Sequence, residues 1–197
     1  MKMEIRNSAV HLSGYVNVVE RDSRILLSPS RGKFVEQVRA KTFQKALEAM
    51  ENVKLLFNHN EQRHLGNTKD GTLKLWEDNI GLRAEAIISD AEVVSKAETN
   101  ELRGWSFGFK SLKEHWDQAG EGLQRRFLEE IMIPEVSILD TTPAYIATSV
   151  EVRSEEQLLE YRGFEFSQEP LQTVDYSISH QITAQEIEYL RLRQGAY

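Results

Sequence analysis

One serine in the sequence has the surroundings that a nucleophilic hydroxyl needs. Ser106 lies between two aromatic residues and two glycines, in the run Gly104-Trp-Ser-Phe-Gly108. Glycines leave the hydroxyl uncrowded and let a ligand approach the backbone closely. The letters match the G-x-S-x-G pattern, but that pattern belongs to a turn between a strand and a helix, and here a strand is expected to follow. A glycine-flanked serine inside an ordinary strand is therefore the alternative.

His59 is the candidate general base. It follows directly on Leu55-Leu-Phe57, an apolar run that predicts a buried strand. A histidine at the end of such a strand can point toward a pocket, and its imidazole exchanges protons near neutral pH. A partly exposed loop histidine explains the same position equally well. The next histidine, His64, lies deeper in a polar run and is expected to be solvated.

A third candidate is a carboxylate in an apolar setting. Glu135 stands between Pro134 and Val136, where an apolar strand would otherwise begin. A carboxylate in that place costs free energy unless it is paired, for example with an imidazole N–H. A glutamate on an edge strand, facing water, is the alternative interpretation.

Composition excludes several other chemistries. The chain has 197 residues and no cysteine, which removes a disulfide framework, a thiolate nucleophile and a cysteine-bound zinc site. The five histidines form no HExxH motif, so we expect neither a metal nor a cofactor. A net charge of −7 argues against a protein that coats nucleic acid. The N-terminus has no signal peptide and no apolar run approaches the roughly 20 residues that span a bilayer, so a cytoplasmic location is expected.

The elements that must position these residues are predicted to be mostly strands. Apolar and alternating runs predict strands at 11–20, 34–39, 53–58, 73–76, 82–88, 106–112, 123–133 and 135–139. Two helices interrupt them: Thr42 is expected to cap one over 43–50, and Asp90 to cap another that ends near 102. The pattern predicts an α+β fold, a mainly antiparallel barrel-like sheet with a few flanking helices.

A change in charge divides the chain near Arg153. Residues 154–197 contain eight acidic residues against three arginines and lack the apolar alternation of the preceding region. We therefore predict a body at 1–153 and an acidic C-terminal segment at 154–197. That segment is expected to contain a linker and one short helix, with a capping box formed by Thr183 and Glu186.

Taken in order along the chain, these segments resemble the prohead (capsid maturation) serine proteases of tailed bacteriophages. The resemblance extends over about residues 11–152. It is carried by the stretches 34–47, 55–60 with Leu65-Gly66, 81–86, 104–109 and 134–145. The ordered combination is far more specific than any one stretch. Asn60 and Asn67 depart from residues that are usual in that family, which affects loop contacts rather than the Ser–His pair.

The resemblance implies a serine endopeptidase whose fold is related to the herpesvirus assemblins. Carried over by position, Ser106 is the nucleophile, His59 the general base and Glu135 the third member, with Asp140 as its rival. Such enzymes lie inside the procapsid, in the host bacterial cytoplasm, and cut scaffold or capsid-protein extension segments before DNA is packaged.

The expected partners follow from the same resemblance. They are the major capsid protein and the scaffold protein as substrates, with self-processing and a homo-oligomer also expected, and no nucleic acid or membrane. Two alternatives stay open: a catalytically inactive structural protein of the procapsid interior with the same fold, and a β-rich binding module in which these residues are surface or core.

Overall fold

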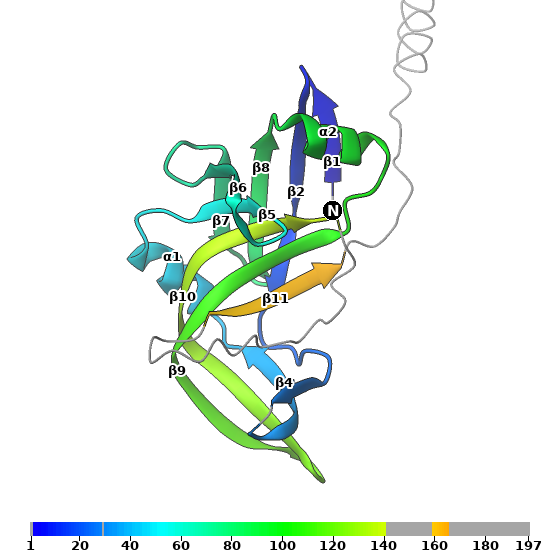
Figure 1. Ribbon diagram of the computed structural model, residues 1–197. Helices are drawn as coiled ribbons and strands as arrows, with labels where there is room; N and C mark the ends of the chain where they lie inside the picture. The colour runs from blue at the N-terminus through cyan, green and yellow to red at the C-terminus, as the bar shows by residue number, and fades with distance from the viewer. Residues whose placement is uncertain (1, 29, 141–158, 166–197) are drawn as a thin grey trace, which may run out of the picture. The chain divides into compact units, whose positions relative to one another are not determined.

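The computed structural model describes residues 2–28, 30–140 and 159–165 (Figure 1). The described residues form mostly strands with two helices, so the predicted α+β content is confirmed, but their strands lie in two sheets and close no barrel. The strands are β1 (Lys2–Arg6), β2 (Ala9–Val18), β3 (Leu26–Ser28), β4 (Gly32–Val38), β5 (Lys54–Phe57), β6 (Asn60–Asn67), β7 (Leu73–Glu77), β8 (Gly81–Ile88), β9 (Gly104–Gly120), β10 (Leu123–Leu139) and β11 (Glu160–Glu165), and the helices are α1 (Thr42–Ala49) and α2 (Ala91–Glu98).

The larger sheet is organised around β10. The order β11-β9-β10-β4-β3 runs across it, and β5 also pairs with β10 while β6 pairs with β5. The first half of β10 pairs in parallel with β4, and the second half pairs in parallel with β5. Antiparallel pairing with β9 runs along the whole length of β10, and Figure 1 shows these two as long bent strands with β11 beside β9. The smaller sheet has the order β1-β2-β8-β7.

One hydrophobic core is filled by strands of both sheets and by both helices. β9 contributes Trp105, Phe107 and Phe109, which are fully buried. Burying side chains of this size stabilises a fold by about 1.5–3 kcal/mol each. Because successive residues of a strand point to opposite faces, Ser106 and Gly108 point away from these aromatic residues. The aromatic alternation thus fixes the face of β9 on which the candidate nucleophile lies.

The break that the sequence predicts at Pro134 is a bulge inside one long strand. Pairing shifts between Met132, opposite Lys110, and Glu135, opposite Gly108. β10 therefore carries one more residue than β9 over this interval, and Pro134, which has no N–H to donate, lies within it. The extra residue sets the register that places Glu135 opposite Gly108.

The two helices begin as the sequence indicates, but only one is capped as expected. Asp90 caps α2, accepting a hydrogen bond from the Val93 N–H at 3.0 Å, and the helix ends at Glu98 rather than near 102. Thr42 does not cap α1: its hydroxyl donates to main-chain oxygens of β10. The Glu77 carboxylate of β7 accepts from the first-turn N–H of Gln44 instead, at 2.8 Å. A tertiary contact has replaced the local cap.

Several elements were not predicted, and β11 is the most important of them. It belongs to the sequence range assigned to the acidic C-terminal segment, yet it pairs with β9 throughout 160–165. The boundary expected near Arg153 and the helix expected after Thr183 lie outside the described residues and stay predictions. In the part of the chain that the structure describes, no helix is long and apolar enough to cross a membrane.

Candidate active site

Two paired strands place four small or polar residues on one face. In the β9–β10 register, Ser106 lies opposite Ser137 and Gly108 lies opposite Glu135. Directly opposite residues of antiparallel strands point to the same side of the sheet. A hydroxyl, a carboxylate and a second hydroxyl therefore meet where the flanking residues of both strands are apolar.

His59 reaches this face from the turn between β5 and β6. Asn58 and His59 both have positive φ, 53° and 57°, as the two central residues of a type I′ hairpin turn do. The Asn58 side chain donates to Asp140 Oδ1 at 2.8 Å, and its main-chain N–H donates to the Ile138 carbonyl at 2.9 Å. The His59 N–H donates to Ser137 Oγ at 3.1 Å. These bonds fix an uncommon backbone conformation against the end of β10.

The His59 ring lies between Ser106 and Glu135. Its Nε2 is 2.8 Å from Ser106 Oγ, and its Nδ1 is 2.7 Å from Glu135 Oε1. The Glu135 side chain is 2% exposed and that of His59 is 21% exposed. A carboxylate without a proton can only accept, so it pairs with a hydrogen on Nδ1, and in a neutral ring Nε2 then turns its lone pair toward Ser106. In this tautomer the ring can receive the serine proton.

β11 gives the Ser106 hydroxyl a second acceptor. Ser106 Oγ donates to the main-chain oxygen of Arg162 at 2.8 Å, where Gly163 lies opposite Ser106 in the strand register. The hydroxyl has one hydrogen and two acceptors, the Arg162 oxygen and His59 Nε2. Sequence reasoning missed this neighbour, although the aromatic residues Tyr161 and Phe164 are types that favour strands.

The ring of Tyr161, which precedes Arg162 in β11, covers the imidazole. The Tyr161 and His59 ring centroids are 4.3 Å apart, with the planes tilted by 56°. Burial raises the pKa of the Tyr161 hydroxyl, and the negative charges of Glu135 and Glu61 raise it further. Tyr161 is therefore a neutral, protonated wall of the site at neutral pH.

Gly108 makes room for the carboxylate. A Cβ added at this position would lie 2.5 Å from Glu135 Oε1 and 3.1 Å from Cε1 of Tyr161. The first distance is far below a normal van der Waals contact. Glycine at this position therefore lets the carboxylate reach His59.

The rival carboxylate, Asp140, is placed beside other partners. It accepts from the Asn58 side chain and lies 3.0 Å from Lys96 Nζ. Burial alone would raise the pKa of Asp140, but hydrogen bonds from Lys96 and Asn58 outweigh burial and lower it. The structure thus brings Glu135 to the imidazole and gives Asp140 a place in support of the turn.

The main-chain N–H groups of Phe107 and Gly108, which follow Ser106 in β9, are directed into the sheet and are not free to bind an oxyanion. β9 is paired on both sides here, with Val136 and Glu135 on one side and Arg162 and Tyr161 on the other. The N–H groups of a central strand point to one neighbouring strand or the other. A substrate oxyanion would therefore have to be bound by other donors.

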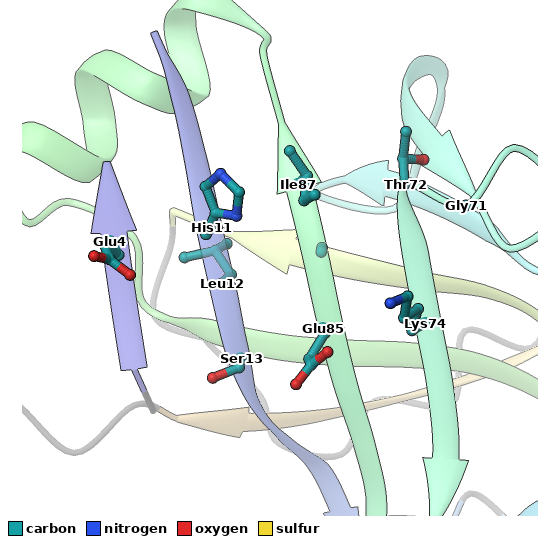
Figure 2. Close-up of a pocket in the computed structure, with 10 residues that line it drawn as sticks. Glu4, His11, Leu12, Ser13, Gly71, Thr72, Lys74, Glu85 and Ile87 are labelled. Atoms are coloured by element: carbon teal, nitrogen blue, oxygen red, sulfur yellow. The ribbon is translucent and has the colours of Figure 1, made fainter. Parts of the chain in front are cut away.

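A hollow of about 230 Å³ lies elsewhere, on the outer face of the smaller sheet. Figure 2 shows His11 and Ser13 of β2, Glu85 and Ile87 of β8, and residues of β1 and β7 around it. These lining residues are different from those predicted to carry chemistry. Within the described ranges, no group of three or more His, Asp or Glu side chains is placed to hold a metal ion.

Comparison with known proteins points to one family. The family model described as caudovirus prohead serine protease matches residues 1–161. A prohead protease of Escherichia phage T5 is 25% identical over an alignment of 150 positions, which covers 69% of this chain and 68% of that protein. No solved structure matches the chain. The family match includes Ser106, His59 and Glu135, and it also extends into β11.

Proposed function

Since the chain belongs to the caudovirus prohead serine proteases, we propose that it cuts scaffold or capsid-protein extension segments inside the procapsid during head maturation. That it is a serine protease follows from the family. The choice of substrate is supported by the description of the family and by the name of the T5 relative, which both refer to the prohead. We also propose a fold related to the herpesvirus assemblins, which is supported by the mainly β architecture, with two helices, of the residues that the structure describes.

Ser106 is the proposed nucleophile, His59 the general base and Glu135 the group that orients and stabilises the imidazolium. One observation carries this assignment: an unbroken row of hydrogen-bonding contacts, 2.8 Å from Ser106 Oγ to Nε2 and 2.7 Å from Nδ1 to Glu135 Oε1. The order of groups is that of a serine protease triad, in which the carboxylate holds the ring tautomer. Both contacts favour an active enzyme over the inactive structural protein of the same fold.

The reaction is acyl transfer. The Ser106 hydroxyl passes its proton to His59 Nε2 while Oγ forms a bond to the carbonyl carbon of the scissile peptide. The tetrahedral intermediate expels the amine, which takes the proton from the imidazolium, and leaves an acyl-enzyme. Water then repeats the sequence: it loses a proton to His59, attacks the ester and releases Ser106 with its proton restored.

The Arg162 oxygen imposes one condition on the first step. Because Ser106 has a single hydroxyl hydrogen, it must be directed to Nε2 rather than to the Arg162 oxygen when Oγ attacks. Rotation of the hydroxyl hydrogen about the Cβ–Oγ bond achieves this, since Oγ already lies 2.8 Å from both acceptors. β11 thus competes with the base for the proton that the reaction transfers.

Self-processing and a homo-oligomer belong to the same proposal, together with a location in the procapsid interior. The experiment is co-expression of the full chain with the cognate capsid and scaffold proteins. Ser106→Ala should abolish cleavage and stay folded. Ser111→Ala, on the same strand with its hydroxyl bonded to Glu114, should cleave like the wild type. Undiminished cleavage by Ser106→Ala would remove Ser106 from the mechanism, and intact scaffold and capsid chains with the wild type would remove the proposed substrates.

A further inference from the structure

One buried hydroxyl in the site is not used by the reaction described above. Ser137 is 0% exposed and lies between Val136 and Ile138, which are equally buried and apolar. Valine or isoleucine would suit such a strand position better, because a buried hydroxyl costs about 1–3 kcal/mol unless it is hydrogen bonded. The serine therefore needs a reason beyond packing.

Both hydrogen bonds of Ser137 go to residues of the site. Its Oγ accepts from the main-chain N–H of His59 at 3.1 Å and donates to Glu135 Oε2 at 2.7 Å. A main-chain N–H can only donate, so the direction of the first bond is fixed. The hydroxyl is then left with its own proton for the carboxylate. One side chain thus connects the backbone of the base to the carboxylate that the base uses.

Each bond limits a different motion. The bond to Oε2 restrains rotation of the carboxylate about its last torsion, so that Oε1 is presented to Nδ1. The bond from the His59 N–H holds the turn at a fixed distance from β10. Since the Asn58 contacts also hold that turn, the carboxylate is the partner whose position depends most on Ser137.

We propose that Ser137 is a positioning residue, which keeps Glu135 and His59 in the geometry that the proton transfer requires. The proposal rests on the roles given to Ser106, His59 and Glu135. A displacement of a catalytic group by about 1 Å can cost roughly a hundredfold in rate. Ser137→Ala should therefore lower kcat about tenfold to a hundredfold on a peptide substrate and leave KM within about threefold.

The conservative variant separates positioning from packing. Ser137→Thr keeps the hydroxyl and should restore most of the lost kcat, whereas Ser137→Val, with no hydroxyl, should not. Thr42→Val is the matched control, since Thr42 is also buried and also donates to β10, but outside the site. It should lower the urea midpoint without lowering kcat. A kcat loss in Thr42→Val equal to that in Ser137→Ala would show a general effect of stability and overturn the proposal.

A double-mutant cycle shows whether Ser137 acts through the carboxylate. In a Glu135→Gln background, Ser137→Ala should cost at most about threefold more, because the group that it positions is already lost. If Ser137→Ala lowers kcat by the same factor in the Glu135→Gln background as in the wild type, the proposal is contradicted. Unchanged kcat in Ser137→Ala alone would also overturn it.

A spectroscopic readout keeps this test separate from the proposed function. The hydrogen-bonded Nδ1–H of His59 gives a downfield proton resonance that needs no turnover. It should be present in the wild type and Thr42→Val, and lost or shifted in Ser137→Ala. If the wild type shows this resonance but Ser106→Ala cleaves as well as wild type, the proposed function fails, whereas loss of the resonance in Ser137→Ala still shows that Ser137 holds His59 against Glu135. An unchanged resonance in Ser137→Ala would overturn the positioning role.

Discussion

Two clusters of buried polar side chains lie along β10, and they differ in whether their hydrogen-bond donors and acceptors are evenly matched. The ion-pair cluster, near the start of the strand, consists of Glu36, Arg126, Glu160 and Arg162. Both oxygens of each carboxylate accept from a guanidinium, at 2.6–3.0 Å. The site cluster, near the end of the strand, consists of Ser106, His59, Glu135 and Ser137. Its Ser106 hydroxyl has one proton and two acceptors, His59 Nε2 and the main-chain oxygen of Arg162. In the ion-pair cluster every carboxylate oxygen already has a donor, so these contacts hold the structure in place. In the site cluster the Ser106 proton can move between two acceptors, as a proton transfer requires.

Arg162 joins the two clusters. Its side chain is buried in the ion-pair cluster, and its main-chain oxygen accepts from Ser106. Tyr161 lies between two residues of the ion-pair cluster in β11 and contacts the His59 ring. The ion pairs therefore fix the strand that covers the imidazole. We therefore predict that substitutions in the ion-pair cluster mainly lower stability, and that substitutions in the site cluster mainly lower turnover.

The largest expected effect is on turnover, from Glu135→Gln. The amide cannot hold the Nδ1–H tautomer as a carboxylate does, and the corresponding change in a serine protease triad costs about 10⁴-fold in kcat. Asp140→Asn should cost much less, since Asp140 pairs with Asn58 and Lys96. Steady-state kinetics on one peptide ranks the two variants. The reverse ranking would transfer the orienting role to Asp140.

The largest expected effect on stability comes from Arg126→Met. This change leaves buried carboxylates of Glu36 and Glu160 short of a partner, which should lower the free energy of unfolding by about 3–5 kcal/mol. Arg125→Met is the matched control, because the Arg125 side chain is 29% exposed and pairs with Asp22 at the surface. It should cost at most about 1 kcal/mol. Urea unfolding measures both, and equal losses would refute the distinction.

Gly108→Ala sharpens the comparison by adding a single carbon to the site. The new Cβ would displace Glu135 Oε1, the end of a side chain that can move, so the structure should adjust while the carboxylate leaves His59. We expect kcat to fall about tenfold to a hundredfold. The free energy of unfolding should fall by at most about 3 kcal/mol. Gly120→Ala, with open space around its Cβ, should change neither. Wild-type kcat in Gly108→Ala would show that the close approach is unimportant.

The smallest effect concerns pH. Burial alone would raise the pKa of Glu160, but hydrogen bonds and charge from Arg126 and Arg162 outweigh burial and lower it below its usual 4.5. A carboxylate whose pKa is lower in the folded state stabilises the fold above its unfolded pKa, and this stabilisation is lost as the pH falls through the folded value. The urea midpoint should therefore fall below about pH 4.5. The fall should be smaller in Glu160→Gln, and an equal fall would assign the acid sensitivity to other carboxylates.

The sequence predicted the parts of the fold that local patterns determine. Alternation along β2 and β8, and the continuous apolar run of β5, predicted those strands, and Asp90 predicted the start of α2. Ser106, His59 and Glu135 were selected by their local surroundings and by the order of segments that contain them. Their assigned roles stay predictions, supported by the distances between them.

The rest depends on contacts between residues far apart in the chain. The acidic character of 154–197 predicted an appendage, yet Glu160 is buried because Arg126 and Arg162 compensate its charge. Thr42 looked like a cap, but the carboxylate that caps α1 comes from Glu77 on another strand. The positioning role proposed for Ser137 likewise depends on a register that only the folded sheet defines. Local sequence contains none of these partners.

The central claim is that Ser106 is a nucleophile activated by His59, and covalent labelling tests it most directly. The full chain is treated with a fluorophosphonate, and the modified residue is identified by mass spectrometry of the digested protein. The account predicts one adduct, on Ser106, which is absent in Ser106→Ala and forms far more slowly in His59→Ala. Ser111→Ala should be labelled like the wild type. A folded wild-type protein that stays unlabelled, or that is labelled at another residue, would contradict the account.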